Sequence, residues 1–152
     1  MAKIAGNTFK TAVEATADVS NGHRPGLRAL GAYSSKITLT NGSLCEGSVD
    51  IDSCTTAKYP NANRWDYCIG YNSSVYFVEV HSANTGGVTE VVKKLQWLKD
   101  WLNSEAPELT KIKAGQPFHW IRSGKYDILP NSPQARLAAR HNIAPIGKLI
   151  LQ

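Results

Sequence analysis

Alternating and helical runs of hydrophobic residues divide this 152-residue chain into a small set of expected elements. Residues 66–71 and 74–81 are largely apolar and aromatic and flank the polar pair Asn72-Ser73, which predicts an antiparallel hairpin with a two-residue turn. Residues 88–102 carry apolar side chains at helical spacing and predict the longest helix. Weaker patterns predict a first helix at 7–19 and a second hairpin, with strands 36–40 and 43–49 around Asn41-Gly42, followed by a loop at 50–63. After the long helix they predict strands at 117–122 and 145–151, with a short helix from 132 or 133 to 140 between them.

Taken in order, these elements give a helix, three strands, a helix and a strand, followed by an extra helix and strand. The fold class that suits this order is α/β (α+β), with a mixed sheet of about four to five strands flanked by helices. The length is that of one domain. We therefore expect residues 1–152 to form a single domain, with its core at about 7–123 and the C-terminal helix and strand at 131–151.

Composition adds information about partners and compartment. The formal net charge of +5 favours anionic partners, nucleic acid first. The chain has no apolar run of about 18 residues and no N-terminal signal pattern, so we expect a cytoplasmic protein that does not enter a membrane. Cys45, Cys54 and Cys68 form no CxxC pair, which favours reduced, mostly buried thiols over a disulfide framework or a structural zinc site.

The first hairpin contains the charged residues that bear most directly on function. If Tyr71 faces Ser74 across the turn, Asp66 falls directly opposite Glu79, with Cβ atoms about 5 Å apart. His81 lies two residues beyond Glu79 and projects from the same face. Directly opposed like charges destabilise a sheet. A divalent cation held between the two carboxylates would explain the arrangement.

Structural roles for the same residues are the alternative. Asp66 would then cap the preceding loop, Glu79 would be a solvated carboxylate, and His81 would be a hydrogen-bonded structural histidine. Of the other histidines, His23 and His119 have no placed partner in the sequence pattern. Asp50 and Asp52 form an Asp-Ile-Asp alternation that could bind a cation, although solvation at a loop edge is favoured.

Asp66, Glu79 and the order of the elements resemble the PD-(D/E)XK nuclease superfamily. Within that broad group, the chain looks most like small bacterial proteins with a similar pairing of Trp65-Asp66-Tyr67 and Glu79-Val80-His81. The resemblance implies a restriction-endonuclease-like core over residues 7–123. It also implies that Asp66 and Glu79 bind Mg²⁺ or Mn²⁺ and activate water, with Glu14 on the first helix as an additional ligand.

The main departure from the superfamily pattern is His81, which stands where the third core strand usually carries a lysine. An imidazole can act as a base near neutral pH, but it lacks a fixed positive charge. Some members without this lysine recruit a basic residue from elsewhere, and the candidates here are Lys36, Lys58 and Lys94. The apolar stripe of the long helix does not include Lys93, Lys94 or Lys99, which favours a solvated face for all three.

Two functions follow from the resemblance. The first is a metal-dependent nuclease that hydrolyses phosphodiester bonds in a bacterial defence or mobile-element context, with Asp66, Glu79 and His81 as catalytic residues. The second is a catalytically inactive nuclease-fold module that binds nucleic acid, DNA in the first place, or a protein partner, with homodimer formation left open. The basic residues expected to contact nucleic acid are Arg64, Lys94, Arg122 and Lys125, with Arg136 and Arg140 as further candidates.

Overall fold

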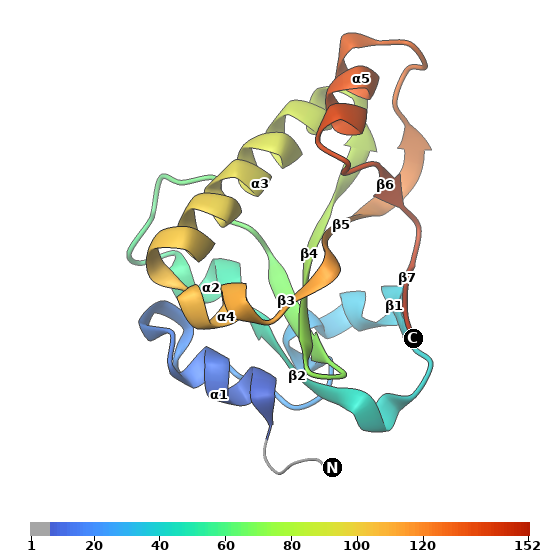
Figure 1. Ribbon diagram of the computed structural model, residues 1–152. Coiled ribbons are helices and arrows are strands. Elements are labelled where there is room, and N and C mark those ends of the chain that lie inside the picture. Colours follow the sequence, from blue (N-terminus) through green and yellow to red (C-terminus); the bar gives the residue numbers. More distant parts are fainter. Residues whose placement is uncertain (1–6) are drawn as a thin grey trace.

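The computed structural model describes residues 7–152 and is built around one five-stranded mixed sheet (Figure 1). The strand order is β2-β3-β4-β5-β6, in which β2, β3 and β4 are antiparallel and β4, β5 and β6 are parallel. The fold is therefore α+β with helices flanking the sheet, as the sequence predicts. The strands are β2 (Cys45–Asp50), β3 (Tyr67–Tyr71), β4 (Ser74–Asn84), β5 (Lys113–Asp127) and β6 (Pro145–Ile146).

Helices cover one face of this sheet. Figure 1 shows α3 crossing that face, with α5 near its N-terminal end and α4 at its C-terminal end. The main hydrophobic core lies between these helices and the sheet and includes Phe77, Leu98 and Trp120. The α-helices are α1 (Thr8–Glu14), α2 (Ile51–Thr55), α3 (Thr85–Glu105), α4 (Pro107–Lys111) and α5 (Pro133–Arg140). Among residues 7–152, no helix has the length and apolar character needed to cross a membrane.

The opposite face of the sheet carries a second, smaller hydrophobic core that includes Ile69, Val78 and Ile121. It is covered by the 3₁₀ segment η2 (Arg28–Lys36) and by a separate two-stranded parallel sheet of β1 (Ile37–Leu39) and β7 (Leu149–Leu151). Two further 3₁₀ turns are η1 (Ala17–Val19) and η3 (Gly42–Leu44). Both faces of β3 and β4 are therefore packed against other elements.

The hairpin prediction at residues 66–81 is confirmed. Tyr71 pairs with Ser74, and the register continues without a shift to Tyr67 opposite Val78. Asn72 and Ser73 have positive φ values of 51° and 65°. A primed turn needs positive φ at both central residues, because this matches the right-handed twist of the flanking strands.

The long helix is also confirmed, and it begins earlier and ends later than residues 88–102. Asn84 caps its first turn by accepting a 2.6 Å hydrogen bond from the backbone N–H of Gly87. Pro107 follows its end and opens α4. The short helix α5 begins as predicted, with Ser132 as its N-cap.

The predicted second hairpin around Asn41-Gly42 is wrong. The Asn41 side chain accepts a hydrogen bond from the backbone N–H of Ser43 and starts the 3₁₀ turn η3, so the chain does not reverse tightly there. Strand β1 instead pairs in parallel with β7. The single closing strand predicted at 145–151 is therefore divided between the two sheets, as β6 and β7.

Two other boundaries differ from the sequence prediction. The first helix, capped by Asn7 as expected, ends at Glu14 instead of continuing to residue 19. The following 3₁₀ turn places Asp18 where it accepts hydrogen bonds from Tyr59 and Trp101, and these contacts replace a further helical turn. The predicted loop at 50–63 contains α2, because Asp50 caps it by accepting a hydrogen bond from the Ser53 N–H.

Candidate functional site

Asp66 and Glu79 lie next to each other at the open end of the β3–β4 hairpin. Asp66 immediately precedes β3, and Glu79 lies within β4. The backbone N–H of Asp66 donates a 3.1 Å hydrogen bond to Glu79 Oε1, and the N–H of Val80 donates a 3.0 Å bond to Asp66 Oδ2. Each carboxylate therefore accepts a backbone hydrogen bond from the opposite segment. The observed register ends with Tyr67 opposite Val78, and its continuation by one residue brings Asp66 to Glu79, as predicted.

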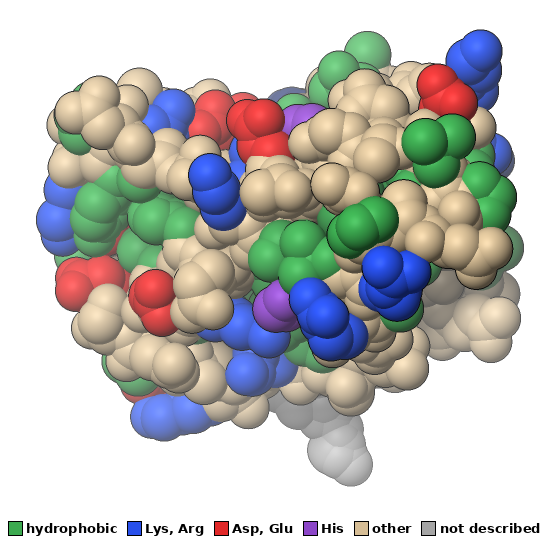
Figure 2. Space-filling view, turned by 90° about the horizontal axis from the view of Figure 1, so that it is seen from above, with side chains coloured by type: hydrophobic (Ala, Val, Ile, Leu, Met, Phe, Trp, Pro, Cys, Tyr) green, Lys and Arg blue, Asp and Glu red, His purple; other side chains and the backbone are tan. Residues whose placement is uncertain are grey.

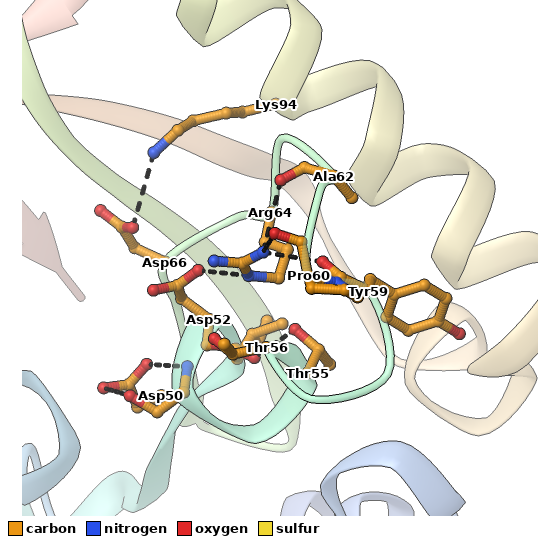
Figure 3. A network of polar contacts seen from close by, with 12 residues as sticks. Asp50, Asp52, Thr55, Thr56, Tyr59, Pro60, Ala62, Arg64, Asp66 and Lys94 are labelled. Carbon is orange, nitrogen blue, oxygen red and sulfur yellow. Dashed lines mark hydrogen bonds and ion pairs between the residues drawn. The ribbon is translucent and has the colours of Figure 1, made fainter.

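The side chain of Lys94 completes this cluster. It comes from α3, which packs over β4, and its Nζ lies 2.5 Å from Glu79 Oε2 and 3.8 Å from Asp66 Oδ1. Figure 3 shows the Lys94 ammonium directed at the Asp66 carboxylate. The Lys94 side chain is only 18% exposed, so the expectation of a solvated face is wrong for this lysine. The spacing of apolar residues along the helix did not predict that Lys94 is buried. The face of α3 that packs on the sheet is wider than its apolar stripe and includes this lysine.

Burial dominates the electrostatics of the cluster. The Glu79 side chain is fully buried, and desolvation raises its pKa to about 8, with the charge of Asp66 acting in the same direction. Desolvation also raises the pKa of Asp66, although Lys94 opposes the shift. The pKa of Lys94 is raised as well, since the two carboxylates outweigh the effect of its own burial. The two carboxyl groups share a single ammonium group. Near neutral pH the pair therefore keeps one proton, whereas two isolated, solvated carboxyl groups would both be ionised.

The structure does not bring His81 into this cluster. By strand alternation His81 shares a face with Glu79, but its Nδ1 lies 3.1 Å from the carbonyl oxygen of Ser82. Its ring also lies close to Gly87 in the first turn of α3. Within residues 7–152 it forms no hydrogen bond with Asp66 or Glu79. Lys94 occupies the position beside the carboxylates instead.

Arg64 and Asp52 form the neighbouring polar network shown in Figure 3. Arg64 Nε donates a 2.7 Å hydrogen bond to Asp52 Oδ1, and Nη1 donates to the carbonyl oxygens of Tyr59 and Pro60. These contacts hold the loop that leads into β3. The guanidinium of Arg64 is engaged within the protein, which favours a structural role over contact with nucleic acid.

The other predicted site residues lie away from the cluster. Glu14 is on the exposed side of α1 and, within residues 7–152, forms no ion pair or hydrogen bond with Asp66 or Glu79. Its role as an additional metal ligand stays a prediction. Arg122 on β5 pairs in register with His81, and Lys125 lies further along β5 and is exposed to solvent. Of the other two candidate lysines, Lys58 pairs with Asp18 and Glu105, and Lys36 ends η2.

The carboxylates of Asp66 and Glu79 are the two acidic groups at this site that could bind a metal ion. Among residues 7–152, no group of three or more His, Cys, Asp and Glu residues is placed to hold one metal ion. Magnesium commonly uses only one or two protein carboxylates and completes its coordination with water and substrate phosphate. Asp66 and Glu79 match that donor set in number and in kind.

Comparisons with protein-family models, with curated protein sequences and with solved structures find no match for this chain. Any proposal about function therefore rests on the positions and charges of the side chains described above.

Proposed function

We propose that this protein is a metal-dependent, nuclease-like hydrolase of phosphodiester bonds, in which Asp66, Glu79 and Lys94 form the catalytic group. The observation that supports this most directly is that a single ammonium group contacts both carboxylates, at 2.5 and 3.8 Å. The nuclease pattern brings two carboxylates and a lysine to one place. Here α3 would supply the lysine that β4 lacks at position 81.

The chemistry of the donor set fits Mg²⁺ or Mn²⁺. Both acidic ligands are carboxylate oxygens, which hard cations prefer. Burial raises the pKa of both carboxyl groups, and a bound cation would oppose that shift and favour ionisation of both. A bound divalent cation would lower the pKa of a coordinated water and offset charge on the phosphoryl oxygens.

Within the chain, each residue has a separate task. The backbone bonds between Asp66 and Glu79 orient both carboxylates before any ligand binds. Lys94 retains its proton because its pKa is raised, so it would supply a fixed positive charge to a substrate phosphate. A neutral imidazole at His81 lacks that charge.

The distribution of charge supports an anionic substrate. In residues 111–152 the only acidic residue is Asp127, whereas the basic residues are Lys111, Lys113, Arg122, Lys125, Arg136, Arg140 and Lys148. Lys111 ends α4 and pairs with Glu108, and the rest of this segment forms β5, α5, β6 and β7. Figure 2, which views the end of the molecule where α5 lies, shows several Lys and Arg side chains gathered beside a histidine. A phosphate backbone would find few repelling charges there.

The inactive-module alternative also has an observation in its favour. Both oxygens of Glu79 already accept hydrogen bonds, one from the Asp66 N–H and one from Lys94. Lys94 thus acts as an internal counter-ion, and the cluster is satisfied without a metal. In that case Asp66, Glu79 and Lys94 stabilise the fold, and the basic surface alone binds nucleic acid.

A cleavage assay distinguishes the two functions. Supercoiled plasmid and labelled oligonucleotides are incubated with the purified chain in millimolar Mg²⁺ or Mn²⁺. We expect wild-type cleavage, an about 100-fold loss in Glu79→Gln and Lys94→Met, and little change in the matched control Lys93→Met. Lys93 is the exposed neighbour of Lys94 on the same helix. Cleavage that survives in His81→Ala but not in Lys94→Met would exclude His81 and assign the positively charged catalytic role to Lys94.

The opposite results are equally specific. Cleavage that survives unchanged in Glu79→Gln would exclude the Asp66–Glu79 site. Absence of wild-type cleavage with both metals, together with salt-sensitive oligonucleotide binding, would establish the binding module instead. Circular dichroism of each variant separates loss of chemistry from loss of folding.

A further inference from the structure

A cavity of about 380 Å³ lies beside the outer edge of β5, at a place distinct from the carboxylate cluster. Strand β6 pairs with β5 only at Trp120 and Ile121, so no strand covers the outer edge of β5 before those residues. Lys99 of α3 forms one wall, and the connection between α5 and β6 forms another. The remaining wall is the start of β5, from Gly115 to Trp120.

The start of β5 leaves the regular sheet register at this cavity. Val75 pairs with Lys113 and Phe77 with Phe118, so four residues of β5 lie opposite one residue of β4. The bulged segment is held by His119, whose Nε2 donates a 2.7 Å hydrogen bond to the carbonyl oxygen of Gln116. Bulges of this kind redirect side chains and often lie beside binding sites.

Positive charge in and around this cavity has no protein counter-charge. Lys99 lines the cavity, and its Nζ lies 5.6 Å from the centroid of the Phe118 ring. Lys113 is not a lining residue, but its Nζ lies 5.9 Å from the same centroid. Within residues 7–152 neither lysine forms an ion pair, and no Asp or Glu lines the cavity. An anion bound beside these ammonium groups would supply the counter-charge that the described residues do not.

The other lining groups suit a planar, partly polar ligand. Phe118 contributes an aromatic surface at the cavity wall, where it also packs against Phe77. His119 must carry its proton on Nε2 to donate to Gln116, which leaves Nδ1 as an acceptor. Burial lowers the pKa of His119 and so favours the neutral ring.

We propose that this cavity binds a small phosphorylated ligand with a planar ring, of the mononucleotide class. Lys99 at the cavity wall holds the phosphate, Lys113 beside the Phe118 ring adds positive charge, and the ligand's ring packs beside Phe118. The volume falls in the range of small-molecule sites, roughly 300–1,000 Å³. This site shares no residue with the carboxylate cluster, so it stands independently of the proposed nuclease function.

Calorimetry with the full chain tests the proposal, using 5′-AMP as the probe and adenosine and inorganic phosphate as partial probes. We expect AMP to bind at least about tenfold more tightly than either partial probe, because only AMP satisfies both the lysines and the ring. Failure of AMP to reach saturation at millimolar concentration would overturn the proposal. Equal affinity for AMP and phosphate would reduce the site to a general anion site and also overturn it.

Variants locate the binding. Lys99→Gln and Lys113→Gln are each expected to weaken AMP binding by about five- to tenfold, whereas Lys93→Gln, on the same helix as Lys99, leaves it unchanged. Phe118→Leu should weaken AMP but not phosphate. If the lysine variants bind AMP like wild type, the cavity is not the site. If a single-stranded oligonucleotide binds in a Lys99-dependent manner while AMP does not, the ligand is a polynucleotide and the small-ligand proposal is wrong.

Discussion

Replacement of Glu79 by glutamine tests the electrostatics of the carboxylate cluster. The Glu79 side chain is fully buried, and burial raises its pKa to about 8 in the folded protein. In an unfolded chain, glutamate has a pKa of about 4.3. Between these two values the folded state holds a proton that the unfolded state has released. Wild-type stability should therefore decrease as the pH rises through this window.

The magnitude follows from proton linkage. One extra proton bound by the folded state lowers the free energy of unfolding by about 1.4 kcal/mol for each pH unit of increase. The effect ends near pH 8, where Glu79 ionises in the folded protein as well. For a chain of this size, that slope corresponds to a fall in Tm of roughly 3–6 °C per pH unit. Glutamine has the same shape and no proton to exchange, so Glu79→Gln should lack this slope.

Urea unfolding followed by tryptophan fluorescence at pH 5, 6, 7 and 8 measures the difference between the two proteins. Groups that titrate in both, such as His119 with its lowered pKa, cancel in the comparison. We expect Glu79→Gln to gain stability relative to wild type at each step from pH 5 to pH 8. Parallel curves would refute the reasoning, since they would mean that Lys94 keeps Glu79 ionised throughout.

Two further predictions concern the scaffold around the site. Asp18→Ala should lower the free energy of unfolding by about 2 kcal/mol, because it removes the acceptor of the Trp101 indole N–H, and chemical denaturation measures this. Gly70→Ala should cost about 2 kcal/mol, because a Cβ there overlaps the ring of Phe9, whereas Gly42→Ala, where a Cβ meets open space, should leave Tm nearly unchanged.

Interactions between near neighbours in the sequence were predictable. The Asn72-Ser73 turn and the alternation of its flanking strands established the β3–β4 register, and that register placed Asp66 beside Glu79. The apolar spacing of residues 88–102 likewise identified α3. Turn geometry and side-chain periodicity are local properties, and here the tertiary contacts agree with them.

Strand partners distant in the sequence were not predictable. Asn41-Gly42 has the composition of a hairpin turn, but the Asn41 side chain caps a 3₁₀ turn instead. The partner of β1 is β7, more than 100 residues later in the sequence. The residues of β1 alone do not indicate such a partner. The pairing forms because β1 and β7 together bury the second hydrophobic core on that face of the main sheet.

The candidate site shows the same division. The sequence alone predicted that Asp66 and Glu79 face each other on one hairpin. It also showed that the residue two positions after Glu79 is a histidine and not a lysine. The tertiary structure decided which positively charged side chain lies beside them, because Lys94 reaches Glu79 only through the position and rotation of α3 over the sheet. Helix packing sets that rotation, and it depends on the core residues of every element that contacts α3.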